Sequence, residues 1–232
     1  MCRLVFLFFL LLSNIAFAEL DWTTALEGRH RSDANKDRDV YRHPRKTLEF
    51  FGLKEGQTVV ELSPGEGWYT EVLAPLTRNG SLYAAHFGVN APSPEYARRS
   101  LGEYLEKLGS DNDMYGKVVL TQLPSVGISE ISPAGSADIV VAFRSVHSWL
   151  RAGTFKQVLE ASYLALKPGG TLGIVQHRSR EERPLDQMKS TGYVTEELVI
   201  SAAEESGFKL QARSEINRNP RDTADHPKGV WN

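Results

Sequence analysis

Short apolar segments alternate with helix-forming segments along most of this chain, and this alternation constrains the fold more than any other feature. The apolar segments have the length of β-strands and cover residues 58–62, 81–85, 118–121, 138–143, 171–176 and 208–216. Between them, start and stop signals predict helices over residues 44–52, 93–109 and 196–206. Because nearly continuous apolar strands that alternate with helices are typical of parallel sheets covered on both faces, we expect an α/β fold with a doubly wound, mostly parallel sheet.

The N-terminus has the organisation of a secretory signal peptide. Residues 1–18 contain one basic residue, Arg3, an unbroken apolar run over residues 4–12, and the small-x-small exit AFA that ends at Ala18. These features predict cleavage after Ala18 and a periplasmic or secreted mature protein. A spanning helix needs about 20 apolar residues, so we expect no stable membrane insertion after cleavage. An uncleaved N-terminal anchor is the alternative.

Composition and charge exclude several other classes of protein and site. The only cysteine is Cys2, so a chain cleaved after Ala18 has no thiol nucleophile, disulfide or cysteine metal ligand. The six histidines form no H-x-x-x-H pair, and the sequence therefore predicts no metal site. A formal net charge of −2 gives no indication of a nucleic-acid partner. The length of 232 residues suits one main domain.

Polar segments flank the alternating region at both ends. We expect residues 19–47 to form a polar N-terminal arm, the main domain to cover residues 48–216, and residues 217–232 to form a C-terminal tail. The arm is either solvated or a lid that closes over a pocket and excludes water. In the second case residues 41–43 would be its working residues.

The most informative motif is a glycine turn that follows the first apolar segment. The sequence VVELSPGEGWYT places Glu61 at the end of the strand, Gly65 and Gly67 in the turn, and a helix directly afterwards. In doubly wound sheets, ligands bind at the carboxyl ends of the strands, and glycine lets the backbone approach a ligand without a Cβ in between. Trp68 and Tyr69 fit helix–sheet packing better than stacking on a ligand.

The residues around this turn restrict the kind of ligand it would bind. Thr70 stands where the dinucleotide fingerprint G-x-G-x-x-G requires its third glycine, and no Gly-Lys-Ser/Thr phosphate loop is present. Glu61, which precedes Gly65 in the turn, instead suits a cationic ligand without phosphate. S-adenosylmethionine is such a ligand, because its sulfonium and amino groups favour a nearby negative charge.

Three motifs in consistent order resemble the class I S-adenosylmethionine-dependent methyltransferases. VVELSPGEG is similar to the first motif of that family. The segment DIVV, which begins at Asp138, is similar to its fourth strand, and the segment LKPGGTL, which begins at Leu166, is similar to the turn before its fifth strand. The resemblance covers about residues 48–216 and implies a Rossmann-like fold, S-adenosyl-L-methionine (SAM) as cofactor, and methyl transfer to a small-molecule or envelope acceptor. Shorter segments resemble a group of bacterial predicted methyltransferases with export signals: residues 41–44, 50–52, 67–70, 143–147 and 219–222.

The resemblance also implies a set of cofactor-binding residues, and two of them depart from the family pattern. Ser63 stands where the family usually has glycine. His86 stands where the family usually has an acidic residue that accepts hydrogen bonds from both ribose hydroxyls, and a neutral imidazole offers one acceptor at most. The implied cofactor-binding residues are Glu61, Ser63, Gly65, Gly67, His86 and Phe143.

Candidate catalytic residues follow the fourth strand and lie in the N-terminal arm. His147 is the candidate general base, because the unperturbed pKa of histidine lies near neutrality, and Arg144 would hold an anionic group of the substrate. A packed structural histidine and a structural ion pair are the alternatives for these two residues. Tyr41 and His43 would complete the site from the arm, and His177 is a weaker candidate.

The sequence leaves more than one function open. The first is SAM-dependent methyl transfer to a small-molecule or envelope acceptor. The second is an exported, non-catalytic ligand-binding domain of the same fold, which Ser63 and His86 favour and which Glu61 and the intact glycine pair oppose. A nucleotide-dependent reductase is disfavoured by Thr70 and by the lack of an acid after the second strand.

Overall fold

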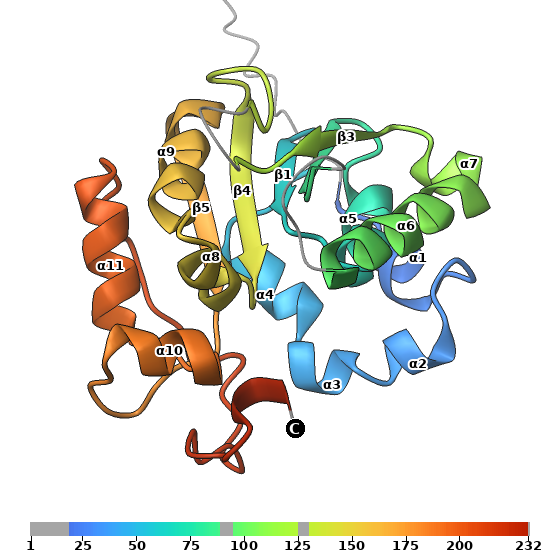
Figure 1. Ribbon diagram of the computed structural model, residues 1–232. Helices are drawn as coiled ribbons and strands as arrows, with labels where there is room; N and C mark the ends of the chain where they lie inside the picture. The colour runs from blue at the N-terminus through green and yellow to red at the C-terminus, as the bar shows by residue number, and fades with distance from the viewer. Residues whose placement is uncertain (1–18, 89–94, 125–129, 232) are drawn as a thin grey trace, which may run out of the picture.

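The structure is a computed structural model that describes residues 19–88, 95–124 and 130–231, so the predicted signal peptide lies outside the described residues. The described chain forms a five-stranded sheet in which all neighbouring strands run parallel, in the order β3-β2-β1-β4-β5 (Figure 1). The predicted α/β class with a doubly wound sheet is therefore confirmed. The strands are β1 (Thr58–Leu62), β2 (Ser81–His86), β3 (Val118–Gln122), β4 (Ala137–Phe143) and β5 (Leu166–Val175).

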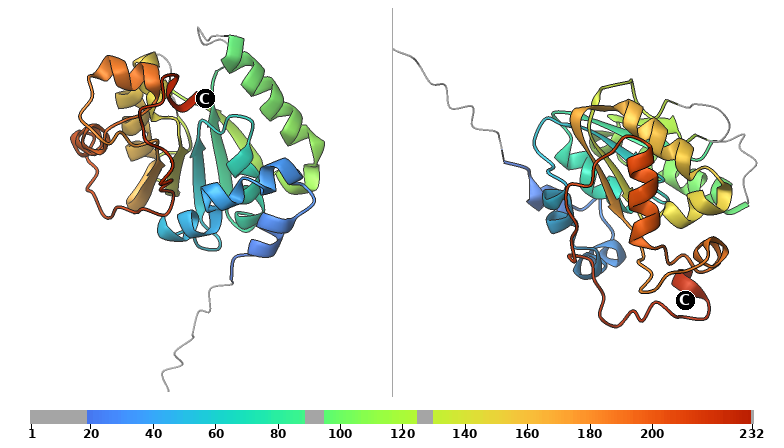
Figure 2. Two further views of the ribbon diagram at one scale, coloured as in Figure 1. Left: turned by 90° about the horizontal axis from the view of Figure 1, so that it is seen from below. Right: turned by 90° about the vertical axis from the view of Figure 1, so that its left-hand side faces the viewer.

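Helices cover both faces of the sheet (Figure 2). Successive side chains of a strand point to opposite faces, and in β1 the buried Val59 packs with the helices of one face while Val60 packs with those of the other. The first face carries α1 (Trp22–Glu27), α4 (Pro44–Phe50), α5 (Trp68–Leu76) and α7 (Asn112–Tyr115), and the second carries α8 (Val146–Ala152) and α9 (Phe155–Ala165). The remaining helices are α2 (Asp33–Lys36), α3 (Asp39–Arg42), α6 (Glu95–Ser110), α10 (Leu185–Thr191), α11 (Glu196–Glu205) and the 3-10 turn η1 (Gly229–Trp231).

The three predicted helices are confirmed as α4, α6 and α11, but the prediction of a sixth strand over residues 208–216 is wrong. This segment has the alternating polar and apolar residues of a half-buried strand, yet it pairs with no strand in the described part of the chain. Alternation favours a strand only where a partner edge lies about 5 Å away. Most of its side chains are exposed, and β5 therefore forms the edge of the sheet.

Residues 19–47, the predicted polar arm, pack against α5. The guanidinium of the buried Arg31 donates to both carboxylate oxygens of Asp39, at 2.8 and 2.7 Å. Trp68 in α5 donates from Nε1 to the Asn35 carbonyl (3.1 Å). Helix α4 continues from residue 47 to residue 48, where we expected the arm to end and the main domain to begin. None of the helices in the described ranges is long and apolar enough to span a bilayer.

Candidate functional site

The glycine turn, residues 63–67, connects β1 to α5 at the carboxyl edge of the sheet. Ser63, Gly65 and Gly67 all have left-handed backbone conformations, with φ values of 52°, 61° and 80°. This conformation favours glycine, and two hydrogen bonds hold the serine in it. Its N–H donates to the Ala85 carbonyl (2.9 Å), and its Oγ accepts from Trp149 Nε1 (3.0 Å). Ser63 is thereby attached to both β2 and α8.

The two glycines of the turn have different surroundings. A Cβ on Gly67 would lie 3.0 Å from Cε2 of Tyr104 and 2.9 Å from Cδ of Lys107, so this glycine allows α6 to pack closely on the turn. A Cβ on Gly65 would have no neighbour within 4 Å among the described residues. The backbone at Gly65 is therefore open to a ligand, whereas Gly67 serves the packing of the protein itself.

Glu61 is enclosed by the protein. Its side chain is buried, and Oε2 accepts a 2.6 Å hydrogen bond from Thr70 Oγ1, which lies 3.2 Å from the Tyr104 hydroxyl. Burial raises the pKa of Glu61 to about 7. The carboxyl group is therefore engaged with α5, and it is only partly ionised near neutral pH.

Both ring nitrogens of His86 have partners within the protein. Nε2 donates to the Gly65 carbonyl (3.0 Å), and Nδ1 accepts from the Phe87 N–H (2.8 Å), which fixes the neutral tautomer with its hydrogen on Nε2. The side chain is fully buried, and burial lowers its pKa. At the position where the resemblance implies a ribose-binding acid, this chain therefore has an imidazole that supports the glycine turn.

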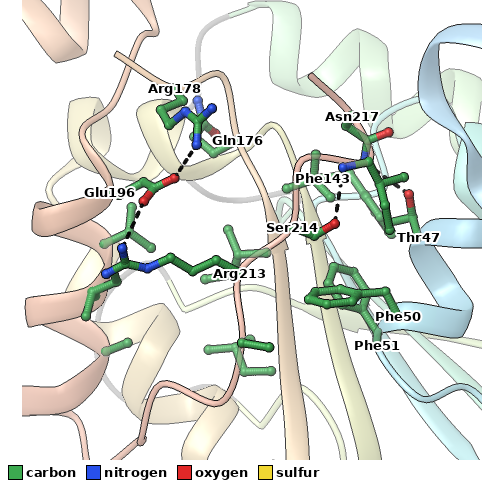
Figure 3. A pocket seen from close by; sticks show the side chains of 18 of the residues that line it. Thr47, Phe50, Phe51, Phe143, Gln176, Arg178, Glu196, Arg213, Ser214 and Asn217 are labelled. Atoms are coloured by element: carbon green, nitrogen blue, oxygen red, sulfur yellow. Dashed lines mark hydrogen bonds and ion pairs between the residues drawn. The ribbon is translucent and has the colours of Figure 1, made fainter. Parts of the chain in front are cut away.

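A cavity of about 2240 Å³ lies beside the carboxyl end of β4 and extends along the open edge of β5 (Figure 3). Phe50 and Phe51 stand on one side of it, and the ion pairs of Glu196 with Arg178 (2.6 Å) and Arg213 (3.7 Å) stand on the other (Figure 3). Its outer wall includes the C-terminal segment, residues 207–220, within which the sequence predicted a sheet strand over residues 208–216. This misplaced strand explains why sequence analysis did not anticipate the cavity.

The predicted site residues other than His147 divide into two groups around this cavity. Five of them line it: Tyr41, His43, Phe143, Arg144 and the weaker candidate His177. Five others lie in or beside the glycine turn, outside the lining: Glu61, Ser63, Gly65, Gly67 and His86. The structure therefore brings most of the candidate catalytic residues together in the cavity, and it places most of the candidate cofactor-binding residues in or beside the glycine turn.

The N-terminal arm reaches the cavity at the junction of α3 and α4. Tyr41 is 76% exposed there, and His43 has a left-handed φ of 43°. His43 Nδ1 lies 3.3 Å from Oδ1 of Asn217, whose Nδ2 donates to Thr47 Oγ1 (3.0 Å). The arm is thus joined to the C-terminal segment across the cavity. No sequence motif marked Asn217 or Thr47 for this contact.

His147 lies in α8, outside the cavity lining. The Gln176 amide accepts from the Val146 N–H through Oε1, so its Nε2 donates to His147 Nδ1 (3.1 Å) and to the Gly192 carbonyl. Burial, followed by the charge of Arg151, lowers the pKa of His147 to about 4. These contacts give the ring a structural partner, and its role as general base stays a prediction.

Arg144 directly follows β4 and has a left-handed φ of 56°. Its N–H donates to the Val175 carbonyl (2.6 Å), which fixes the backbone beside the end of β5. Its partly buried guanidinium forms no ion pair with the carboxylates of the described residues, and burial and the charge of Arg38 lower its pKa. The arrangement leaves its positive charge available at the inner end of the cavity.

Comparison with known proteins identifies the fold. No protein-family model matches the chain, and no curated protein matches it. A SAM-dependent methyltransferase from Aquifex aeolicus superposes with a TM-score of 0.54 at 22% identity, covering 76% of this chain and 85% of that one. The chain has the fold of the SAM-dependent methyltransferases. Human N-acetylserotonin methyltransferase in complex with SAM gives a TM-score of 0.52 at 16% identity over 79% of this chain and 50% of its own.

The same fold also carries other chemistry. The [4+2]-cyclase SpnF superposes with a TM-score of 0.56 at 16% identity, covering 74% of this chain and 58% of that chain. The activity therefore has to be argued from the residues of the site and not from the fold.

The residues at the carboxyl edge fit SAM in part. The open backbone at Gly65 is suited to close contact with a ligand. Glu61 and His86 are bonded within the protein, so a cofactor here would be held mainly through the backbone of the turn.

Proposed function

We propose that this protein binds SAM at the glycine turn and transfers its methyl group to an acceptor in the cavity. The open backbone at Gly65 carries this proposal, because ligands of doubly wound sheets bind at this edge and the fold is shared with SAM-dependent methyltransferases. The register of β1 and β4 pairs Leu62 with Ala142. Ser63 therefore lies beside Phe143, which lines the cavity, so that cofactor and acceptor would be neighbours.

When bound, SAM supplies an electrophilic methyl carbon, to which an acceptor atom donates an electron pair while the carbon–sulfur bond breaks and its electrons stay on sulfur. The residues of this chain have to position the acceptor for that in-line displacement. Tyr69 and Phe143, whose ring centroids lie 3.3 Å apart, form a rigid wall beside the turn. Arg144 and Arg42 supply positive charge that would orient an anionic acceptor.

A second function, ligand binding without catalysis, is favoured by specific contacts. Glu61 and His86 are occupied by Thr70 and Gly65 and do not face a ligand. Arg144 directly follows β4, which neighbours β1, and its positive charge would disfavour a sulfonium at short range. In this case the cavity would bind its ligand in the absence of a methyl donor.

Calorimetric titration of the purified protein with SAM, and with NAD as control, separates these functions. We expect micromolar binding of SAM and no binding of NAD, because Thr70 interrupts the dinucleotide fingerprint. Absence of SAM binding at millimolar ligand would contradict methyl transfer and would favour the second function.

We further propose that residues 1–18 direct export and that the mature protein is periplasmic or secreted, on the evidence of the apolar run and the AFA exit alone. A reporter joined after Ala18 should then be found outside the cytosol. A reporter that stays in the cytosol would contradict export.

A further inference from the structure

Two partly buried arginines of the cavity lining, Arg42 and Arg144, form no ion pair within the described residues, and the exposed Arg38 of the same lining lies near both. The guanidinium carbon of Arg42 lies 4.3 Å from the ring centroid of Trp68, and Arg144 follows β4. Burial, then the charges of Arg144 and Arg38, lower the pKa of Arg42 to about 9. Two positive charges in a partly buried site repel each other, and an anion that binds between them stabilises both charged groups.

The carboxylates that act on this region are engaged elsewhere. Asp39, which lies near Arg42, binds the Arg31 guanidinium through both oxygens. Asp222, which lies near His177 on the cavity wall, accepts a 2.8 Å hydrogen bond from the Tyr193 hydroxyl. The other carboxylates of the described cavity lining form no ion pair with the two arginines either, so the positive charge of the arginines is available to an anionic ligand.

Beyond these arginines, six apolar side chains from three segments line the cavity: Leu172 and Ile174 of β5, Val199 and Ile200 of α11, and Phe208 and Leu210 of the C-terminal segment. The ion pairs of Glu196 with Arg178 and Arg213 line it between them. Its volume of about 2240 Å³ leaves room for an extended ligand. A ligand with an apolar part would contact these side chains while its anionic group lies at the arginines.

We propose that the cavity binds an anionic amphiphile, with its charged head between Arg42 and Arg144 and its apolar chain along β5 and α11. The head carries a carboxylate or a phosphate, both of which pair well with guanidinium groups. This inference rests on the proposed function, since such a molecule would be the methyl acceptor. The six apolar side chains supply affinity, and the arginines set the orientation of the ligand.

Calorimetric titration with twelve-carbon amphiphiles, each below its critical micelle concentration, tests the proposal. We expect dodecanoate or dodecyl phosphate to bind at least tenfold more tightly than dodecyltrimethylammonium, and also at least tenfold more tightly than acetate or inorganic phosphate. A preference for one of the two anions identifies the head group. Equal affinity for the anionic and cationic amphiphiles would overturn the proposal.

Matched variants assign the binding to the arginines. Arg144→Gln is expected to weaken binding of the anionic amphiphile at least tenfold, whereas Arg99→Gln, an exposed arginine of α6, should bind it as the parent does. Arg42→Gln serves the same purpose if circular dichroism shows that Arg144→Gln does not fold. The assignment would be overturned if folded Arg144→Gln bound the anionic amphiphile as tightly as the parent protein does. The same holds for Arg42→Gln where it replaces that variant.

The same protein preparation separates this inference from the proposed function. SAM binding without binding of any anionic amphiphile contradicts this inference alone. Binding of an anionic amphiphile without SAM binding contradicts methyl transfer and leaves the ligand class of the cavity supported.

Discussion

Gly65→Val is expected to abolish SAM binding while circular dichroism stays close to that of the parent protein. The glycine has a φ of 61°, and no atom of the residues that the structure describes lies within 4 Å of the position of its Cβ. A branched side chain would fill the space that a ligand needs to reach the backbone of the turn. The left-handed conformation costs an L-residue about 1–2 kcal/mol, so the variant should fold with reduced stability.

Gly135→Val is the matched control for this substitution. Gly135 has a φ of 62° and, within the described ranges, also no atom within 4 Å of its Cβ position, but it precedes β4 at the opposite end of the sheet from the glycine turn. Both variants should lose similar amounts of unfolding free energy, and only Gly65→Val should lose SAM affinity. SAM affinity retained in Gly65→Val, or lost equally in both variants, would contradict the assigned site.

Glu61→Gln is expected to change how the stability of the protein depends on pH. Burial raises the pKa of Glu61 from 4.5 to about 7, so between these pH values the folded state binds more protons than the unfolded state. The free energy of unfolding of the parent therefore falls as pH rises through this window and levels off above it. Glutamine can still accept the Thr70 hydrogen bond but does not ionise, so we expect the variant to be more stable at pH 8 by on the order of 1–3 kcal/mol.

Urea denaturation at pH 5 and pH 8 measures this effect. The variant and the parent should differ little at pH 5, where buried Glu61 is largely protonated, and clearly at pH 8. Glu66→Gln is the control, because Glu66 lies in the same turn with an exposed side chain and should follow the pH profile of the parent. Equal stability of Glu61→Gln and the parent at pH 8 would show that Glu61 is not buried as described.

The sequence predicted the parallel sheet because its strands are apolar and its helices carry local start and stop signals. Val59 and Val60 pack on opposite faces, as a strand buried on both sides requires. The sixth strand could not be judged in this way, because strand formation depends on a partner edge that is distant in sequence. The alternating residues 208–216 look the same whether they pair with β5 or, as here, form a wall of the cavity.

The candidate site was predictable in its position but not in the roles of its residues. The glycine pair marks the carboxyl edge of β1, yet only the structure shows that Gly65 is open and that Gly67 is packed under Tyr104 and Lys107. The hydrogen-bond partner of the His147 ring is Gln176, which is distant from it in the sequence. Contacts of this kind depend on tertiary packing, which one sequence does not reveal.

The most direct test of the account is a titration of ¹⁵N-labelled protein with SAM, followed by amide chemical shifts. We predict that the largest shifts fall on the amides of Ser63, Gly65 and Phe143, because the cofactor would lie against the turn and beside the end of β4. Shifts confined to residues away from the carboxyl edge, or no shifts at saturating SAM, would contradict the proposed site and with it the proposed methyl transfer.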